Sequence, residues 1–196
     1  MSTVANRRMT LEEYLNFDDG TDTRYELVNG ELVEMSSESN LNNLIALYLL
    51  TELLRFVPIR LLRHKDTEIL VTGFRATVRF PDLMVLSEES ADALTGATRS
   101  IITLDMPPPA LVVEVVSPGT ANEERDYRYK RSEYAARGIA EYWLVDPQQA
   151  QVVVLTLVAG LYEDALFKDS DRIISPTFPN LELTAAQILQ ADTQEG

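Results

Sequence analysis

The sequence feature that most constrains the fold is a glutamate inside an apolar run. Pro107, Pro108 and Pro109 stop any preceding element, and residues 110–117 then read Ala-Leu-Val-Val-Glu-Val-Val-Ser. A short continuous apolar run of this kind is typical of a central strand that is buried on both faces of a sheet. Glu114 lies in the middle of the run, where an unpaired carboxylate is costly. The sequence therefore predicts a buried strand and a partner for its carboxylate.

The segment that follows this strand predicts a βαβ unit. A charged helix is expected over about residues 122–137, because Gly138 is a usual C-terminal cap, and residues 141–146 form the next predicted strand. The helical crossover makes the two strands parallel neighbours, and a right-handed connection is strongly preferred. Together with the hairpins predicted elsewhere, this unit indicates a mixed sheet in a protein of the α/β or α+β class.

The N-terminal part of the chain carries two strong local signals. Thr10 and Glu13 form a capping box that opens a short helix. The dipeptide Asn29-Gly30 supplies the two positive-φ residues of a type I′ turn between residues 24–28 and residues 31–35. This pattern predicts a β-hairpin.

The remaining elements follow from hydrophobic periodicity. Leucines at three- and four-residue spacing predict an amphipathic helix over residues 40–56 that covers one face of the sheet. Thr184 caps a last short helix. The further predicted strands are residues 67–71, 75–80, 83–87, 150–157 and 161–168.

Composition restricts the chemistry that is open to the protein. The chain has no cysteine and one histidine, His64, which excludes disulfides, thiolate nucleophiles and zinc fingers and nearly excludes Ser-His-Asp triads. Catalysis would therefore depend on carboxylates, lysine, arginine and tyrosine.

Length and hydropathy favour one domain over the whole chain. The 196 residues, 45% of them apolar and 24% charged, are enough for one core, expected over about residues 9–170, with a short disordered tail after about residue 191. No run approaches the roughly 18 apolar residues of a membrane helix, and the first residues lack the apolar core of a signal peptide. We therefore expect a cytoplasmic protein without a membrane partner.

The net charge of -14, from 31 acidic and 17 basic residues, repels polyanions at long range. Any phosphate-binding site must therefore be local. Basic side chains concentrate in residues 55–80 and 123–137, and these stretches could line one groove with Arg75 and Arg128 as substrate contacts. The alternative is ordinary scatter of surface charge.

Asp82 and Glu114 are the first candidate site residues. Asp82 follows Pro81 at the start of an apolar strand, as Glu114 lies within another. Two carboxylates on neighbouring strands, without histidine or cysteine, suit a hard cation such as Mg²⁺ or Mn²⁺. The alternative is that Asp82 begins a turn and that Glu114 pairs with an arginine such as Arg75 or Arg79.

The predicted helix after Glu114 adds three residues. Asp126, Lys130 and Tyr134 are spaced at i, i+4 and i+8, which places them along one stripe of the helix. Glu114 lies roughly 10 Å from the end of its strand and Lys130 roughly 12 Å into the helix, so the two residues have similar depth. Lys130 could then reach Glu114. The alternative is a surface ion pair between Asp126 and Lys130.

Several separated motifs, in order, resemble the putative restriction endonuclease family of Uma-two type, within the PD-(D/E)xK nuclease superfamily. The resemblance spans about residues 9–170 and implies a restriction-endonuclease-like mixed sheet flanked by helices. The motifs are residues 24–36 around the hairpin, Pro81-Asp82, residues 109–120 around Glu114, the trio Asp126, Lys130 and Tyr134, and residues 138–147 around Trp143.

The resemblance also implies roles for individual residues. Asp82 and Glu114 would be magnesium ligands, with the carbonyl of Val115 as a third. In many superfamily members the catalytic lysine lies two residues after the glutamate, where this chain has Val116; in the resembling family the following helix supplies it, which corresponds to Lys130.

Two further positions follow from the same resemblance. Glu26 matches a family acid and is either a further metal ligand or an outward-facing strand residue. Asn42 stands where family members often have histidine. Asp126 and Tyr134 would hold the lysine in place.

The function expected from these features is that of a Mg²⁺- or Mn²⁺-dependent endonuclease that hydrolyses DNA phosphodiester bonds. A duplex cutter usually works as a symmetric dimer, so we expect a homodimer. A first alternative is a weakened nuclease-fold module that binds DNA or a protein without cutting, since a fold does not establish an activity. A second alternative is a metal-dependent hydrolase of nucleotides, which the acidic surface would suit.

Overall fold

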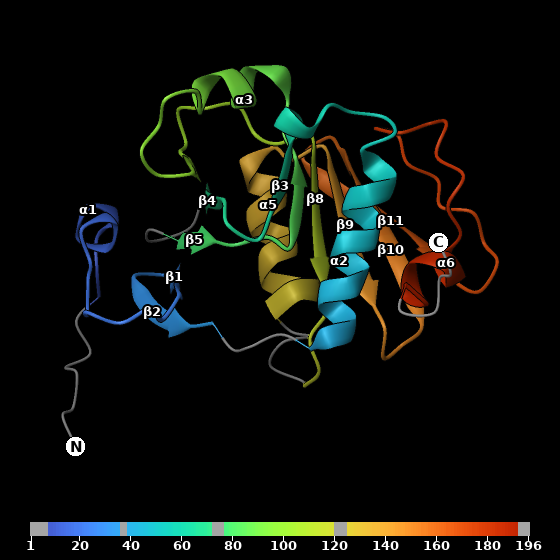
Figure 1. The fold of residues 1–196 in the computed structure, drawn as a ribbon, viewed down its shortest axis with the longest axis horizontal. Coiled ribbons are helices and arrows are strands. Elements are labelled where there is room, and N and C mark those ends of the chain that lie inside the picture. Colours follow the sequence, from blue (N-terminus) through green and yellow to red (C-terminus); the bar gives the residue numbers. More distant parts are fainter. Residues whose placement is uncertain (1–7, 36–38, 72–76, 120–124, 192–196) are drawn as a thin grey trace.

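The computed structural model describes residues 8–35, 39–71, 77–119 and 125–191. Its strands form two mixed sheets that helices flank (Figure 1). Arg75, the first residues of the helix predicted from residue 122, and the tail predicted after residue 191 lie outside the described residues.

The larger sheet contains the predicted βαβ unit. Its strand order is β11-β10-β9-β8-β6-β3. Strands β8 and β9 are parallel, as predicted, and every other neighbouring pair in this sheet is antiparallel. Its strands are β3 (Leu62–His64), β6 (Leu83–Val85), β8 (Leu111–Val115), β9 (Glu141–Asp146), β10 (Gln151–Val158) and β11 (Leu161–Phe167).

The smaller sheet is built around the predicted hairpin. Asn29 and Gly30 have φ values of 51° and 83°, which is the left-handed conformation that a type I′ turn requires. The strand order is β2-β1-β5-β4-β7, with β4 and β7 parallel. Its strands are β1 (Tyr25–Val28), β2 (Glu31–Glu34), β4 (Glu68–Val71), β5 (Thr77–Arg79) and β7 (Ile101–Ile102).

The division into two sheets was not expected, because the sequence patterns indicated one. The chain leaves the smaller sheet at the end of β5 and enters the larger sheet at β6, through Phe80, Pro81 and Asp82. Proline cannot donate a ladder hydrogen bond, so Pro81 favours an interruption of pairing at this point. The crossing places Asp82 where the two sheets meet.

The helices agree with the predicted signals. Both predicted caps are present, with reciprocal capping-box bonds at Thr10 and at Thr184. Within the described ranges, no helix combines the length and apolar character needed to cross a membrane. The helical elements are α1 (Leu11–Leu15), α2 (Asn40–Leu53), the 3-10 turn η1 (Ile59–Leu61), α3 (Glu88–Ala93), the π-helical η2 (Arg125–Lys130), α5 (Arg131–Arg137) and α6 (Ala185–Leu189).

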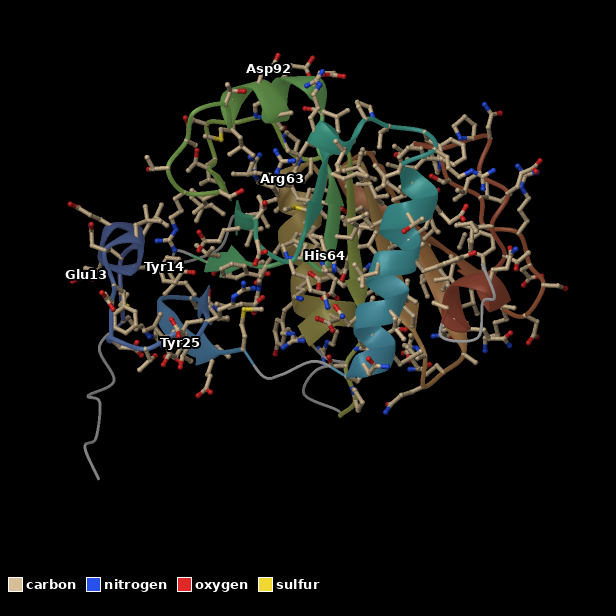
Figure 2. The ribbon with its side chains drawn as sticks, viewed as in Figure 1. Glu13, Tyr14, Tyr25, Arg63, His64 and Asp92 are labelled. Atoms are coloured by element: carbon tan, nitrogen blue, oxygen red, sulfur yellow. The ribbon has the colours of Figure 1, made fainter. Side chains whose placement is uncertain are left out.

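The short elements η1, α3, β3 and β7 had no sequence prediction. Strand β3, which carries Arg63 and His64, is one of them (Figure 2). A strand of three residues is too short to show an alternating pattern, so only pairing with β6 defines it.

Helices α2 and α5 lie on opposite faces of the larger sheet (Figure 1). Successive side chains of a strand point to opposite faces. Val113 of β8 accordingly packs with Ile45 of α2, whereas Val112 packs in the cluster that contains Tyr134 of α5. By the same alternation Glu114 faces α5, the helix that carries the predicted catalytic stripe.

Gly138 provides a first test of this arrangement. It caps α5 with φ 82°, and its N–H donates to carbonyls of the last helical turn. Among the described residues other than its chain neighbours, none has an atom within 4 Å of a Cβ at this position, so the backbone conformation is what opposes a side chain. We expect Gly138→Ala to lower the free energy of unfolding by about 1–2 kcal/mol in urea denaturation. Gly138→Asn should lose less, because asparagine tolerates this conformation. An alanine variant as stable as the wild type would contradict the assignment.

Candidate active site

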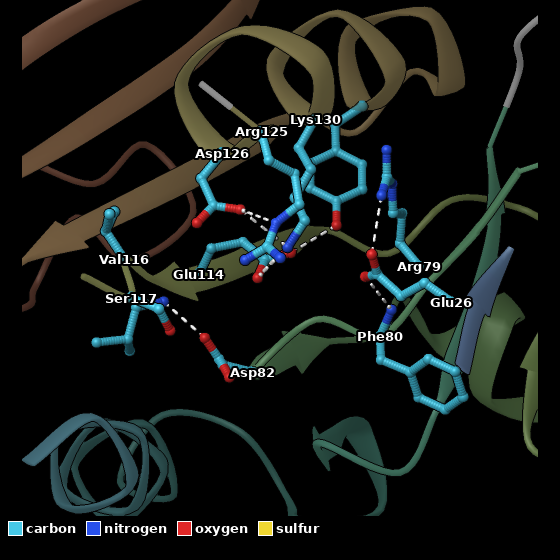
Figure 3. Close-up of polar contacts among 12 residues, drawn as sticks. Glu26, Arg79, Phe80, Asp82, Glu114, Val116, Ser117, Arg125, Asp126 and Lys130 are labelled. Atoms are coloured by element: carbon cyan, nitrogen blue, oxygen red, sulfur yellow. Dashed lines mark hydrogen bonds and ion pairs between the residues drawn. The ribbon is translucent and has the colours of Figure 1, made fainter. Parts of the chain in front are cut away.

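A buried lysine holds two carboxylates together at the centre of the site. Lys130 Nζ lies 2.7 Å from Glu114 Oε2 and 3.1 Å from Asp126 Oδ1 (Figure 3). The hydroxyl of Tyr134 donates to Glu114 Oε1 at 2.7 Å. Each of these side chains is buried. The stripe predicted from helical spacing therefore does face Glu114, and the alternative of a surface ion pair between Asp126 and Lys130 is wrong.

Asp82 approaches the same place from the junction of the two sheets. Its Oδ2 accepts the backbone N–H of Val115 at 2.7 Å, and its Oδ1 lies 3.8 Å from Lys65 Nζ. Because Val115 follows Glu114 on β8, this bond fixes the position of Asp82 relative to Glu114. The pairing of neighbouring strands β6 and β8 brings the two predicted carboxylates together.

A small pocket of about 50 Å³ opens between these groups. Asp82, Glu114 and Val115 line it, together with Lys130 and Arg125. In the part of the chain that the structure describes, no three Asp, Glu or His side chains form a metal-binding group. A cation in this pocket would therefore rely on two carboxylates and a main-chain carbonyl. These are oxygen donors of the kind that Mg²⁺ and Mn²⁺ accept, so the residues fit such an ion.

Glu26 lines the pocket from the smaller sheet. It is only 5% exposed, so the alternative of an outward-facing strand residue is wrong. Arg79 donates to Glu26 Oε2 at 2.8 Å and makes a bidentate contact with Glu133 of α5, both bonds 2.8 Å long. Arg79 is therefore not the partner of Glu114, as one alternative held. It instead ties β1 to α5.

Two further basic residues of the site were predicted only as members of the basic stretches 55–80 and 123–137. Arg125 lines the pocket, is about one-third exposed, and donates from Nε to Asp126 Oδ1 at 3.0 Å. Lys65 adopts a left-handed φ of 58°, rare for a residue with a side chain, and contacts Asp82. Neither of these two contacts was predicted individually.

Asn42 connects α2 to the end of β8. It is buried, and its Nδ2 lies 3.4 Å from the carbonyl oxygens of Val115 and Val116 and from Ser117 Oγ. An amide at this position donates hydrogen bonds at any ordinary pH. Asn42 therefore supports the strand end that carries the predicted third ligand, and it is not an acid or a base.

The pKa values of the carboxylates are shifted in different directions. Burial raises the pKa of Glu114 to about 8, against the attraction of Lys130 and reinforced by repulsion from Asp82 and Asp126. Burial likewise raises the pKa of Asp82, although the N–H of Val115 opposes the change. Burial also opposes ionisation of Asp126, yet Lys130 and Arg125 hold its pKa below the usual range. A cation in the pocket would favour the ionised forms of Glu114 and Asp82, which burial disfavours.

The remaining substrate contacts predicted from the sequence are only partly described. Arg128 lies on η2 and is exposed to solvent. Arg75 lies outside the described residues. The grouping of both arginines in one groove stays a prediction.

Comparisons with known proteins show the family and the fold of the chain. Residues 11–186 match the sequence model of the family Uma2, described as "Putative restriction endonuclease". A crystal structure of a "putative nuclease belonging to DUF820" from Anabaena variabilis superposes with a TM-score of 0.71 at 17% identity, covering 93% of this chain and 98% of that one. At this identity the likeness shows the fold. A search of curated proteins finds no match.

The raised pKa of Glu114 predicts a pH dependence of stability without metal. Folded Glu114 keeps its proton up to about pH 8, whereas the unfolded chain loses it near the ordinary value of 4.5. Between these values the folded state binds more protons, so the contribution of Glu114 to the free energy of unfolding falls as pH rises. We expect wild type to lose stability relative to Glu114→Gln between pH 5 and pH 8, measured by urea denaturation in EDTA.

The control for this comparison is Glu163→Gln, on an exposed position of β11. Its stability should follow that of wild type across the same pH range. Identical pH profiles for wild type and Glu114→Gln would show that Glu114 ionises in the folded protein as it does in the unfolded chain.

Proposed function

The chain belongs to the Uma2 family of putative restriction endonucleases, and on this premise we propose that it is a metal-dependent endonuclease that hydrolyses phosphodiester bonds of DNA. The observation that carries the proposal is the convergence of Asp82, Glu114 and Lys130 on one pocket. Two carboxylates and a lysine at one point are the groups that hydrolysis of a phosphodiester requires when histidine and cysteine take no part.

The metal would be Mg²⁺ or Mn²⁺. The carboxylates of Asp82 and Glu114 and the carbonyl of Val115 would hold it. When bound, such an ion lowers the pKa of a water ligand and neutralises charge on phosphate oxygens. The backbone N–H of Val115 orients Asp82, and the Tyr134 hydroxyl orients Glu114, so both carboxylates have fixed directions before any ion binds.

Lys130 acts as a donor and a positive charge. Burial opposes its protonation, but Asp126 and Glu114 raise its pKa above the ordinary value, so it keeps its proton at neutral pH. A lysine in this state cannot accept a proton from water. It can donate a hydrogen bond to the attacking water or stabilise the charge that develops on the phosphate. Asp126 holds the ammonium group in place for this role.

Arg125 is the group best placed to bind the substrate phosphate. It lies at the mouth of the pocket, and its Nε is anchored on Asp126. A guanidinium group binds phosphate oxygens through paired N–H donors. Arg128, farther out on η2, and Arg75 would contact neighbouring phosphates of the backbone. Cutting both strands of a duplex takes two such sites, and a homodimer would supply them.

One observation favours the second candidate function, a module that binds DNA without cutting it. Both oxygens of Glu114 already contact side chains, Oε2 the ammonium of Lys130 and Oε1 the hydroxyl of Tyr134. To bind a metal ion, Glu114 would have to share an oxygen that already contacts Lys130 or Tyr134. Cleavage assays separate the two functions.

The first test is activity on supercoiled plasmid. With Mg²⁺ or Mn²⁺ we expect nicked or linear product, because the pocket then holds the groups needed to activate water. Asp82→Asn, Glu114→Gln and Lys130→Met should each lower the rate by about 100-fold or more, measured by gel electrophoresis. Lys168→Met, at an exposed position, is the matched control and should cut like wild type. Wild-type protein that binds plasmid but never cuts it would support the binding module instead.

The second test concerns phosphate contacts. The assay uses Ca²⁺, which takes oxygen ligands and should not support cleavage. DNA affinity should fall steeply as the salt concentration rises, because binding of the protein releases cations from the DNA backbone. Arg125→Ala and Arg128→Ala should each lower the slope of log affinity against log salt by about one, measured by fluorescence anisotropy. Lys168→Ala, at an exposed position outside both basic stretches, should leave the slope unchanged. Unchanged slopes in both η2 variants would remove these contacts from the proposal.

A further inference from the structure

A second pocket lies beside the catalytic one. Its volume is about 330 Å³, at the lower end of the range for pockets that bind small molecules. Phe80 lines both pockets, so the two pockets adjoin at this residue. The second pocket is therefore close enough to receive a group that is covalently attached to a substrate in the first.

The chain alternates between the two pockets. On β1, Tyr25 lines the second pocket and the next residue, Glu26, lines the catalytic one. Asp66 lines the second pocket, whereas the preceding residue, Lys65, contacts Asp82. Neighbouring residues of the same segments thus contribute to both pockets, which fixes the two pockets side by side.

Aromatic side chains form much of the second pocket. Phe17 and Tyr25 meet edge to face, with ring centroids 5.9 Å apart, and Phe80 adds a third ring. Tyr14 lies next to Tyr25 and donates from its hydroxyl to the Tyr25 carbonyl at 2.9 Å (Figure 2). Phe17 is 38% exposed, so part of its ring is open to a ligand. Exposed aromatic rings of this kind stack with flat ligands.

The charged groups of the second pocket argue against a phosphate ligand. Both arginines are already paired, Arg24 with Asp66 and Arg99 with Glu68. Asp18 and Asp19 add further negative charge. An anion would be repelled here, whereas an uncharged planar group with hydrogen-bonding edges would find rings to stack on and polar groups at its edges.

We propose that the second pocket binds a nucleobase of the substrate strand, next to the phosphate held in the catalytic pocket. The inference rests on the proposed nuclease function and names a subsite of it. The base packs against the rings of Phe17 and Phe80 while its phosphate faces Arg125. A base inside a duplex cannot enter a pocket, so the substrate at this point is either single-stranded or has one base turned out of the stack.

The test compares two single strands of equal length and charge, oligo(dA) and an abasic strand with the same phosphates. Affinities are measured by fluorescence anisotropy in Ca²⁺. Stacking is worth about 1–3 kcal/mol per base, so wild type should prefer oligo(dA) by about 5- to 150-fold. The double variant Phe17→Leu, Phe80→Leu should lose this preference and keep its affinity for the abasic strand.

Two control variants test whether the preference for oligo(dA) depends on the aromatic rings of the second pocket. Phe80→Tyr retains the ring and should retain the preference. Phe56→Leu removes an aromatic side chain that is equally exposed, at 38%, and lines neither pocket, so it should also bind like wild type. Equal affinity of wild type for both strands, or a preference that survives in the double variant, would overturn the subsite.

The plasmid assay separates this outcome from failure of the proposed function. Cleavage of plasmid by a protein without base preference would leave the nuclease standing and remove the subsite. A protein that neither cuts plasmid nor binds either strand would overturn both proposals.

Discussion

The site depends on one buried interaction, the contact of the Lys130 ammonium with the carboxylates of Glu114 and Asp126. A buried charge is tolerated only when it is paired and hydrogen-bonded, so the Lys130 ammonium requires these two partners. The interaction joins β8 to η2 and therefore sets how the crossover helix packs on the larger sheet. The hydroxyl of Tyr134, one helical turn further on, completes the hydrogen bonding of Glu114.

A second buried group extends this interaction to the smaller sheet. Arg79 of β5 binds Glu26 of β1 and, through both of its other nitrogens, Glu133 of α5. The helix that carries Tyr134 is therefore attached to both sheets. Removing Arg79 would leave the buried Glu26 without its arginine, which costs several kcal/mol. The two sheets and the helix thus hold the catalytic pocket from three sides.

The acidic character of the chain and a polyanionic substrate are compatible if attraction is confined to the pocket. The pocket contains a lysine that keeps its positive charge and an arginine at its mouth. Its carboxylates suit a divalent cation. The chain as a whole repels DNA at long range, since its net charge is -14. Such a distribution favours contact with a short stretch of backbone over a long one, which agrees with a subsite for a single base beside the scissile phosphate.

Local patterns in the sequence were sufficient for most secondary structure and for the centre of the site. The Asn29-Gly30 turn, the capping boxes and the strand around Glu114 depend on neighbouring residues, and the stripe of Asp126 and Lys130 depends on helical spacing; all are present in the structure. Only the tertiary structure decided the rest. The strands divide into two sheets. Arg79 binds Glu26 and Glu133, and Lys65 contacts Asp82; these contacts join segments that are far apart in the chain. Such contacts leave no periodic trace in a sequence, because they arise where strands and helices meet and not within any one of them.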